Sequence, residues 1–139
     1  MWVELAVASG MVLLTVSIHA VGLNSLQRLF RGHVRAHTDR SPTWIARLRL
    51  VVLIVLGLFV LHGLEIWLYA GLYCLLGAVE SLRQAVYFST ITYGAIGYSD
   101  HAMDQDWRLV GAIEGINGVL LLGWTTAFFV TVMSKLQRR

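Results

Sequence analysis

Residues 92–100 read TYGAIGYSD, and this short polar stretch decides the fold because of where it stands in the chain. The residues that lead into it, 85–92 (AVYFSTIT), suffice for about two helical turns. A longer apolar segment lies on each side of the whole region. Two turns and a glycine-punctuated loop are too short and too polar to cross a hydrocarbon core of about 30 Å. The pattern therefore predicts a segment that enters the membrane and leaves it on the same side.

The apolar segments of the chain predict three membrane-spanning helices. Hydrophobic residues make up 57% of the 139 residues, and the mean hydropathy is +0.67, well above what is usual for soluble domains. The spans are expected at about residues 5–23, 48–76 and 108–134. The first is expected to be retained rather than cleaved as a secretory signal, because no basic residue precedes it.

The segment between the first two spans is basic. It carries six arginines against one acidic residue, Asp39. Leu26, Leu29 and Phe30 recur there at helical spacing, which predicts a helix lying on the membrane surface with its arginines near anionic lipids. Pro42 would break that helix, because proline cannot continue one.

Charge predicts the orientation. Nine of the 11 Lys and Arg residues, the six arginines above with Lys135, Arg138 and Arg139, fall on the side shared by the basic segment and the C-terminus. Arg83 and Arg108 fall on the other side. The positive-inside rule then places the N-terminus outside, the basic segment and the C-terminus in the cytoplasm, and the loop at 92–100 open to the exterior.

Irregular backbone at membrane depth points to a pore. It survives only where it lines a water-filled path or is packed inside protein, because lipid offers no hydrogen bonds. A loop with Gly94 and Gly97, and with its carbonyls in an extended, alternating conformation, is therefore a candidate ion path. One chain has too few spans to enclose such a path, so a closed ring of copies is expected.

Residues from about 48 to 135 resemble the pore module of the tetrameric two-transmembrane potassium channels, in the prokaryotic ion channel branch. The resemblance is carried by AVYFSTITYGAIGYSD (85–100) and by WRLVGAIEGINGVLLLGWTTAFF, which begins at Trp107. It implies an all-α membrane protein of three transmembrane helices plus a re-entrant pore helix and filter loop, assembled as a homotetramer in the inner membrane of a prokaryote. The expected divisions are an N-terminal helix (1–24), a basic linker (25–47) and a pore module (48–139) with outer helix 48–76, pore helix 82–93, filter 95–99 and inner helix 108–134.

The resemblance also implies roles for individual residues. Backbone carbonyls of the filter would replace the hydration shell of K⁺, the permeant ion, and no other cofactor is expected. The residues of this ion-binding filter are Ala95, Ile96, Gly97, Tyr98 and Ser99. Tyr98 would pack against Tyr87, Asp100 would hydrogen-bond toward Tyr87, and Gly118 would be the hinge of the inner helix.

Two filter positions depart from the family pattern. Ala95 stands where a threonine hydroxyl usually completes the innermost ion site, and Ser99 stands where a glycine is usual. A residue other than glycine at positive φ costs about 1–2 kcal/mol. Three outcomes are therefore open: a K⁺-selective pore, a weakly selective cation pore, or a filter that does not conduct.

Several polar or pore-facing residues inside the spans are further candidates. Thr15, His19 and Gly22 form a stripe that is expected to face protein, with His19 as a packing residue. His62 and Glu65, three residues apart, can pair on one helix face, and Glu65 would brace the pore helix or sense protons. The remaining candidates are Glu114 and Asn117 as supports behind the pore helix, and Val119, Leu122, Thr126, Val130 and Met133 as cavity wall or gate.

Other functional classes lack the residues they need. The histidines are scattered, Cys74 is the single cysteine, and neither a catalytic triad nor a metal-ligand spacing is visible, so we expect no enzyme and no small-molecule substrate. Topology and anionic lipid explain the arginines without nucleic acid. The remaining rival to a channel is a membrane scaffold that keeps a pore-like fold without conducting.

Overall fold

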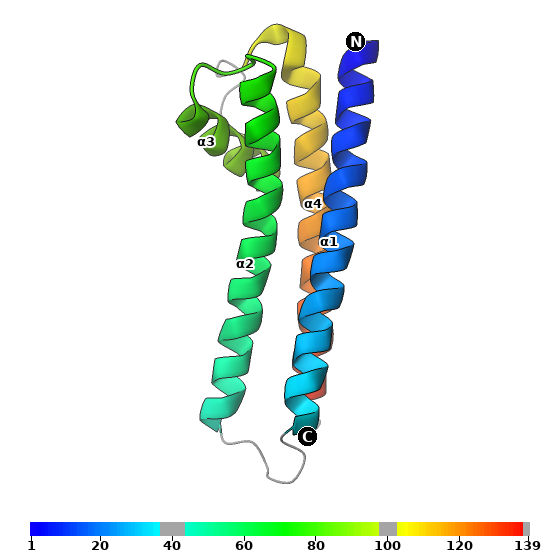
Figure 1. The fold of residues 1–139 in the computed structure, drawn as a ribbon, viewed down its shortest axis with the longest axis vertical. Coiled ribbons are helices and arrows are strands. Elements are labelled where there is room, and N and C mark those ends of the chain that lie inside the picture. Colours follow the sequence, from blue (N-terminus) through cyan, green and yellow to red (C-terminus); the bar gives the residue numbers. More distant parts are fainter. Residues whose placement is uncertain (37–43, 98–102, 138–139) are drawn as a thin grey trace.

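The structure is a computed structural model that describes residues 1–36, 44–97 and 103–137. Three long helices run side by side: α1 (Trp2–Ala36), α2 (Trp44–Leu75) and α4 (Arg108–Gln137) (Figure 1). The short helix α3 (Leu82–Tyr93) packs against α2 and α4 at the end of the molecule where the N-terminus lies. A single 3-10 turn, η2 (Gln105–Trp107), leads into α4.

All three long helices are long and apolar enough to cross a membrane. By contrast, α3 has 12 residues and is therefore only about 18 Å long, less than the thickness of a hydrocarbon core. Its bounds are those predicted from the sequence. The Ser81 side chain caps its first turn by accepting a hydrogen bond from the Gln84 amide at 3.3 Å.

The first helix does not end near residue 24, where the predicted N-terminal helix ends, because α1 continues to Ala36. The prediction of a separate surface helix within 25–47 is therefore wrong for the described part of that segment, 25–36. No proline occurs before Pro42, so nothing in the sequence stops the helix earlier. Phe30, which was expected to face the lipid surface, is only 5% exposed and packs in a cluster with Leu50 of α2 and Val132 of α4.

Two apolar clusters hold the helices together, one at each end. The cluster near α3 includes Tyr69, Tyr73 and Phe88, and the one at the opposite end includes Phe30 and Leu58. Buried polar side chains lie in the long helices and α3 as well: Thr15, His19, Glu65, Ser89, Glu114 and Asn117. The stripe predicted to face protein does so, since Thr15 and His19 are fully buried and Gly22 lies beneath the Leu61 side chain.

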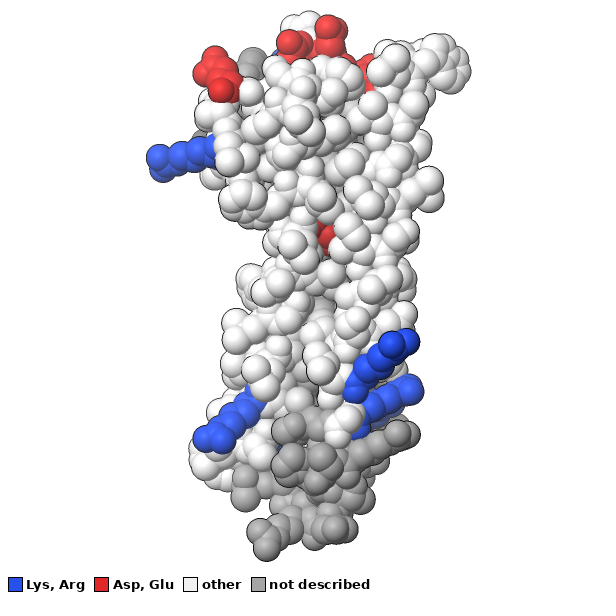
Figure 2. Space-filling view, in the orientation of Figure 1, with Lys and Arg blue, Asp and Glu red and all other residues white. Residues whose placement is uncertain are grey.

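Charge is distributed unevenly along the molecule (Figure 2). Acidic side chains gather at the end that carries α3, where Glu80, Asp104 and Asp106 are exposed. Most of the basic side chains seen in this view lie toward the opposite end, where α1 ends and α2 begins. The orientation predicted from the Lys and Arg residues would place the acidic end outside and the mainly basic end in the cytoplasm.

Candidate functional site

The backbone that follows α3 folds into a tight helix-ending turn. The Ile96 amide donates to the Ile91 carbonyl at 2.8 Å, and the Ala95 amide donates to the Thr92 carbonyl at 2.9 Å. Ala95 has a φ of +55°. These are the bonds and the left-handed residue of a Schellman motif, a position at which glycine is usual. The Gly97 amide adds a second bond to the Ile91 carbonyl, at 3.2 Å.

This turn differs from the extended backbone expected at the start of the filter. The amides of 95–97 are bound back to α3, so the local hydrogen bonds of the helix end determine their conformation. Ala95 is the one residue other than glycine with positive φ in the described ranges, and the strain expected at Ser99 stays a prediction. Tyr98, Ser99 and Asp100 lie outside the described residues.

The carbonyl groups of this turn, unlike its amides, form no hydrogen bonds with α3. Among the described residues, no group donates a hydrogen bond to the carbonyl oxygens of 94–97. Ala95, Ile96 and Gly97 are exposed, with Ile96 69% exposed. The turn therefore presents successive backbone acceptors, without a donor among the described residues, beside α4, a helix long and apolar enough to span a membrane.

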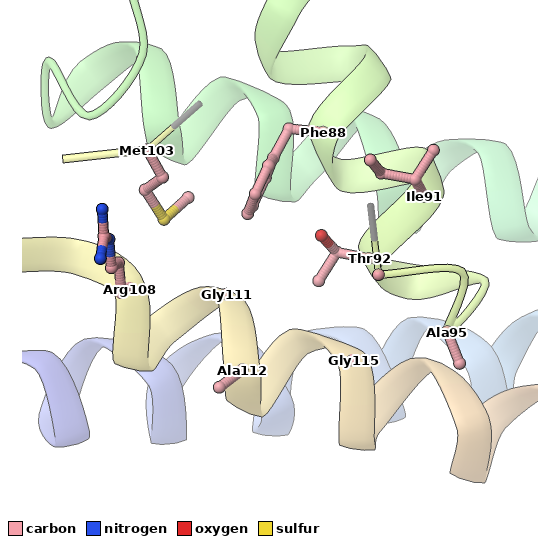
Figure 3. A pocket seen from close by; sticks show the side chains of 10 residues that line it. Phe88, Ile91, Thr92, Ala95, Met103, Arg108, Gly111, Ala112 and Gly115 are labelled. Atoms are coloured by element: carbon pink, nitrogen blue, oxygen red, sulfur yellow. The ribbon is translucent and has the colours of Figure 1, made fainter. Parts of the chain in front are cut away.

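A cavity of about 260 Å³ lies between the turn, α3 and the first half of α4 (Figure 3). Its lining includes Phe88, Thr92 and Ala95 on one side and Gly111 and Gly115 on the other. A Cβ at Gly111 would lie 3.2 Å from the Phe88 ring, and one at Gly115 would lie 3.4 Å from the Thr92 carbonyl oxygen. The two glycines thus allow α3 to pack closely against α4.

Gly118 lies directly against the end of α3. A Cβ at this position would stand 2.2 Å from the Tyr93 carbonyl oxygen, a distance that no real side chain tolerates. Helix α4 runs without interruption through Gly118. The structure therefore gives this glycine a packing role, and the hinge stays a prediction.

Further along α4, most of the side chains predicted to line the pore cavity are exposed on a single chain. The exposed side chains include Val119, which is 51% exposed, and three others of the predicted set: Leu122, Thr126 and Val130. A second cavity of about 400 Å³ lies where Ala95 meets Val119. Met133, predicted to belong to the gate, instead packs partly against the apolar cluster around Phe30.

Buried hydrogen bonds hold the middle of α3 against α2 and α4. Glu114 of α4 is fully buried and accepts hydrogen bonds from the hydroxyls of Ser89 on α3 and Tyr73 on α2. The Asn117 amide donates to Thr15 Oγ1 at 2.8 Å and to the Tyr69 hydroxyl at 3.4 Å. Of the two predicted supports, only Glu114 contacts α3, because the Asn117 side chain joins α4 to α1 and α2.

Glu65 holds the C-terminal end of α3 in place. It is fully buried and accepts a hydrogen bond from the Tyr93 hydroxyl, at the last residue of α3. Its Oε2 lies 3.5 Å from Nδ1 of His62, the pairing expected from their spacing. Tyr87, predicted to support the filter, is 60% exposed on the single chain.

Sequence reasoning missed the side chains that complete this network. His19 Nδ1 lies 2.9 Å from Glu65 Oε1, and Thr125 Oγ1 lies 3.2 Å from His19 Nε2. The burial of His19 was predicted from its stripe, but its partner is 46 residues away and no local spacing indicates it. Tyr93 and Thr125 carried no signal of their own in the sequence.

Comparison with known families gives a match to the part of the chain that contains α3 and α4. A family model described as "Ion channel" matches residues 59–135, more than half of the chain, from the middle of α2 almost to the end of α4. Comparison with curated proteins and with solved structures gave no match. The matched region contains α3, the turn with its free carbonyls and the α4 face beside it. The chain therefore belongs to this ion channel family.

Proposed function

We propose that this ion channel is a homotetramer that conducts K⁺ through backbone carbonyls at the C-terminal end of α3. The observation that carries the proposal is the turn at 94–97, whose amides are bound to α3 while its carbonyls have no partner among the described residues. Carbonyl oxygens in rings replace the hydration shell of K⁺ in selective filters. Ala95, Ile96 and Gly97, followed by Tyr98 and Ser99, would supply these rings.

Four copies would complete what one chain leaves open. The exposed α4 residues Val119, Leu122, Thr126 and Val130 would face a common axis, and the cavities on either side of Ala95 would be closed by neighbouring subunits. Closed cyclic symmetry satisfies all such contacts with one type of interface. Cross-linking of the reconstituted protein should therefore end at four chains.

The charge distribution supports cation passage. The outer side carries exposed Glu80, Asp104 and Asp106 on each chain, and four copies would form an acidic rim that concentrates cations. The basic segment 25–49 would lie in the cytoplasm against anionic lipids, with the N-terminus outside and the protein in the plasma membrane of a prokaryote.

A second candidate, a weakly selective cation channel, is favoured by one observation. Ala95 supplies no side-chain oxygen to the innermost site and holds a strained left-handed conformation. Both effects would weaken the coordination that distinguishes K⁺ from Na⁺. Ser99, in place of the usual glycine, would add to them at the outer end.

Ion flux into liposomes tests these alternatives. Wild-type protein is compared with Ala95→Thr, Ser99→Gly and the double variant, under K⁺ and then Na⁺ gradients. Faster K⁺ than Na⁺ flux in the wild type supports the first proposal, and equal fluxes support the second. If only the double variant passes K⁺, the natural filter is non-conducting and the protein is a scaffold. If no variant conducts, the proposed conduction is wrong.

A further inference from the structure

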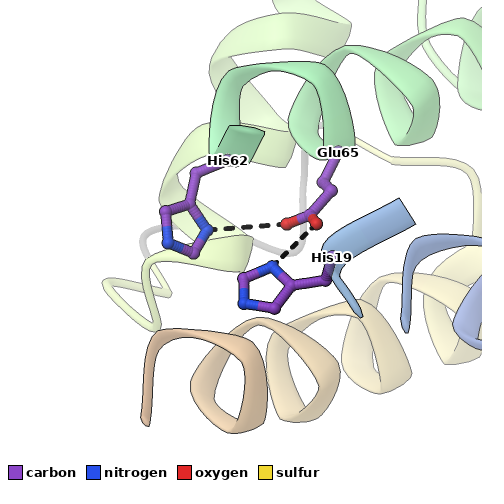
Figure 4. A group of neighbouring side chains, drawn as sticks. All are labelled: His19, His62 and Glu65. Atoms are coloured by element: carbon purple, nitrogen blue, oxygen red, sulfur yellow. Dashed lines mark hydrogen bonds and ion pairs between the residues drawn. The ribbon is translucent and has the colours of Figure 1, made fainter. Parts of the chain in front are cut away.

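A cluster of metal-binding side chains lies buried between α1 and α2 (Figure 4). His19 comes from α1, and His62 and Glu65 come from α2. Nδ1 of His19 lies 2.9 Å from one Glu65 oxygen, and Nδ1 of His62 lies 3.5 Å from the other. One ligand atom from each residue falls within 4.8 Å of the other two. Two imidazoles and a carboxylate thus converge on one point.

Thr125 orients both rings toward that point. Its Oγ1 lies 3.0 Å from His62 Nε2 and 3.2 Å from His19 Nε2. A hydroxyl oxygen has two lone pairs and can accept from both Nε2–H groups. In that state both Nδ1 atoms carry lone pairs. The His19 lone pair faces the Glu65 carboxylate at 2.9 Å. The His62 lone pair lies 2.9 Å from the Tyr93 hydroxyl and 3.5 Å from the carboxylate. Second-layer hydrogen bonds such as those to Thr125 fix the tautomer of histidines that bind metals.

With both Nδ1 atoms unprotonated, their lone pairs and the Glu65 carboxylate form a site that favours a positive charge. Among the described residues, Glu65 forms ion pairs with histidines alone, and no Lys or Arg reaches it. The Tyr93 hydroxyl donates one hydrogen bond to the carboxylate, which neutralises no charge. A carboxylate that is fully buried at membrane depth is costly unless a cation or a proton compensates it.

A route to the cluster exists from one side. A cavity of about 630 Å³ is lined by His62, Tyr93 and Thr125 and extends to Ile96 at the end of α3. His62 is the one ligand that is not fully buried, with 14% of its side chain exposed, whereas His19 and Glu65 are fully enclosed. An ion that arrives through this cavity would meet His62 first and then the two buried ligands.

We propose that His19, His62 and Glu65 bind one divalent transition-metal ion of the Zn²⁺ class. Two histidines and a glutamate are a donor set that Zn²⁺ uses when a fourth position stays open for water. Mg²⁺ and Ca²⁺ prefer all-oxygen sites and are expected to bind poorly. Tetrahedral Zn²⁺ with bonds of about 2.0–2.1 Å holds its ligand atoms about 3.3 Å apart. The His19 and Glu65 atoms, 2.9 Å apart, must separate slightly, and the widest separation, up to 4.8 Å, must shorten, which rotation of the partly exposed His62 ring can provide. The bound ion would join α1 to α2 beside the residue that fastens α3.

Metal binding to the purified full-length protein tests this proposal independently of conduction. Zn²⁺ is titrated against a chromophoric chelator, and Co²⁺ is used as a spectroscopic probe because low-symmetry N/O coordination intensifies its visible absorption. We expect one Zn²⁺ per chain, a rise in melting temperature with Zn²⁺ and none with Mg²⁺. His19→Gln and His62→Gln should each weaken Zn²⁺ binding at least about 10-fold, since even outer-layer partners contribute that much.

Matched controls separate this site from other ligands of the chain. His33→Gln changes a histidine on the same helix α1, and Cys74→Ser removes the single thiol, so neither should alter the affinity. In the Cys74→Ser background, His62→Cys should retain Zn²⁺ and give Co²⁺ a sulfur-to-metal charge-transfer band. This band places the ion at position 62 even if another variant fails to fold. Absence of stoichiometric binding, equal affinity in His62→Gln, or no such band in His62→Cys would overturn the proposal.

Discussion

At the scale of single residues, Ala95 determines how the chain leaves α3. Its left-handed conformation lets the amides of 95–97 bond back to the helix and leaves the carbonyls free. A methyl group at this position is unfavourable compared with glycine, and no contact in the described structure requires the side chain. The residue thus stores a small strain at the point where ions are proposed to pass.

Replacing Ala95 with glycine should stabilise the protein. Ala95→Gly removes the penalty of an L-residue at positive φ, so we expect the free energy of unfolding to rise by about 1 kcal/mol. Equilibrium unfolding in mixed micelles measures it. Ala112→Gly provides a control of opposite sign, because Ala112 lies inside α4, where glycine costs about 0.5–1 kcal/mol. A lower stability for Ala95→Gly would show that the turn does not adopt this conformation.

Gly118→Ala should destabilise the protein, since its methyl group would meet the Tyr93 carbonyl. Overpacking of this kind typically costs about 1–3 kcal/mol, and backbone on both sides limits relaxation. Gly123→Ala is the matched control on α4, because a Cβ there meets nothing within 4 Å and alanine favours the helix. Comparison of melting temperatures decides the matter, and equal values for the two variants would contradict the close contact.

At the scale of elements, α3 is held by hydrogen bonds at its middle and at its end. Ser89 bonds to Glu114 of α4 and to the Ile66 carbonyl of α2, the latter at 3.0 Å, while Tyr93 bonds to Glu65 of α2. A helix of 12 residues has little stability of its own. Its position relative to the long helices therefore depends on these buried bonds and on the glycines of α4 that let it approach.

Removing the Glu114 carboxylate should loosen this attachment. Glu114→Ala leaves the hydroxyls of Ser89 and Tyr73 without a common partner and opens a cavity, so we expect a loss of at least about 1–3 kcal/mol. Glu80→Ala, at an exposed position before α3, should change stability by less than about 0.5 kcal/mol. Unfolding curves of the two variants that coincide would argue against a supporting role for Glu114.

At the scale of the whole molecule, polar groups from all four helices meet in one buried network. His19 of α1, Glu65 of α2, Tyr93 of α3 and Thr125 of α4 are linked through direct contacts. The end with α3 is acidic and the opposite end is mainly basic (Figure 2). Together these features give the bundle a defined arrangement of helices and two ends of different charge, on which the proposed direction across a membrane rests.

The direction can be measured by thiol labelling in intact cells. In a Cys74→Ser background, Glu80→Cys should react with a membrane-impermeant maleimide from outside, because Glu80 is exposed at the acidic end. Ser134→Cys, near the end of α4, should react only after the membrane is opened. The reverse pattern would show that the positive-inside rule fails for this chain.

Local patterns in the sequence predicted the elements better than the contacts between them. The bounds of α3 are those that the resemblance to the channel family implies, and the pairing of His62 with Glu65 follows from their i, i+3 spacing. The contact between His19 and Glu65 spans 46 residues, so no spacing rule indicates it. The predicted end of the N-terminal helix at residue 24 is wrong because the change from apolar to basic residues there does not interrupt a helix, and α1 runs on to Ala36.

The polar contacts of α1 have a consequence for how the chain is made. Thr15 meets Asn117 across 102 residues, and His19 meets Thr125 across 106. At synthesis rates of about 5–20 residues per second, about 5–20 s separate the appearance of each pair. His19 can already meet Glu65 once α2 has been made, 46 residues later, but Thr15 has to wait for Asn117 of α4. The buried contacts of α1 are therefore completed only after α4 has been made, so the assembly of this bundle is a late step of its synthesis.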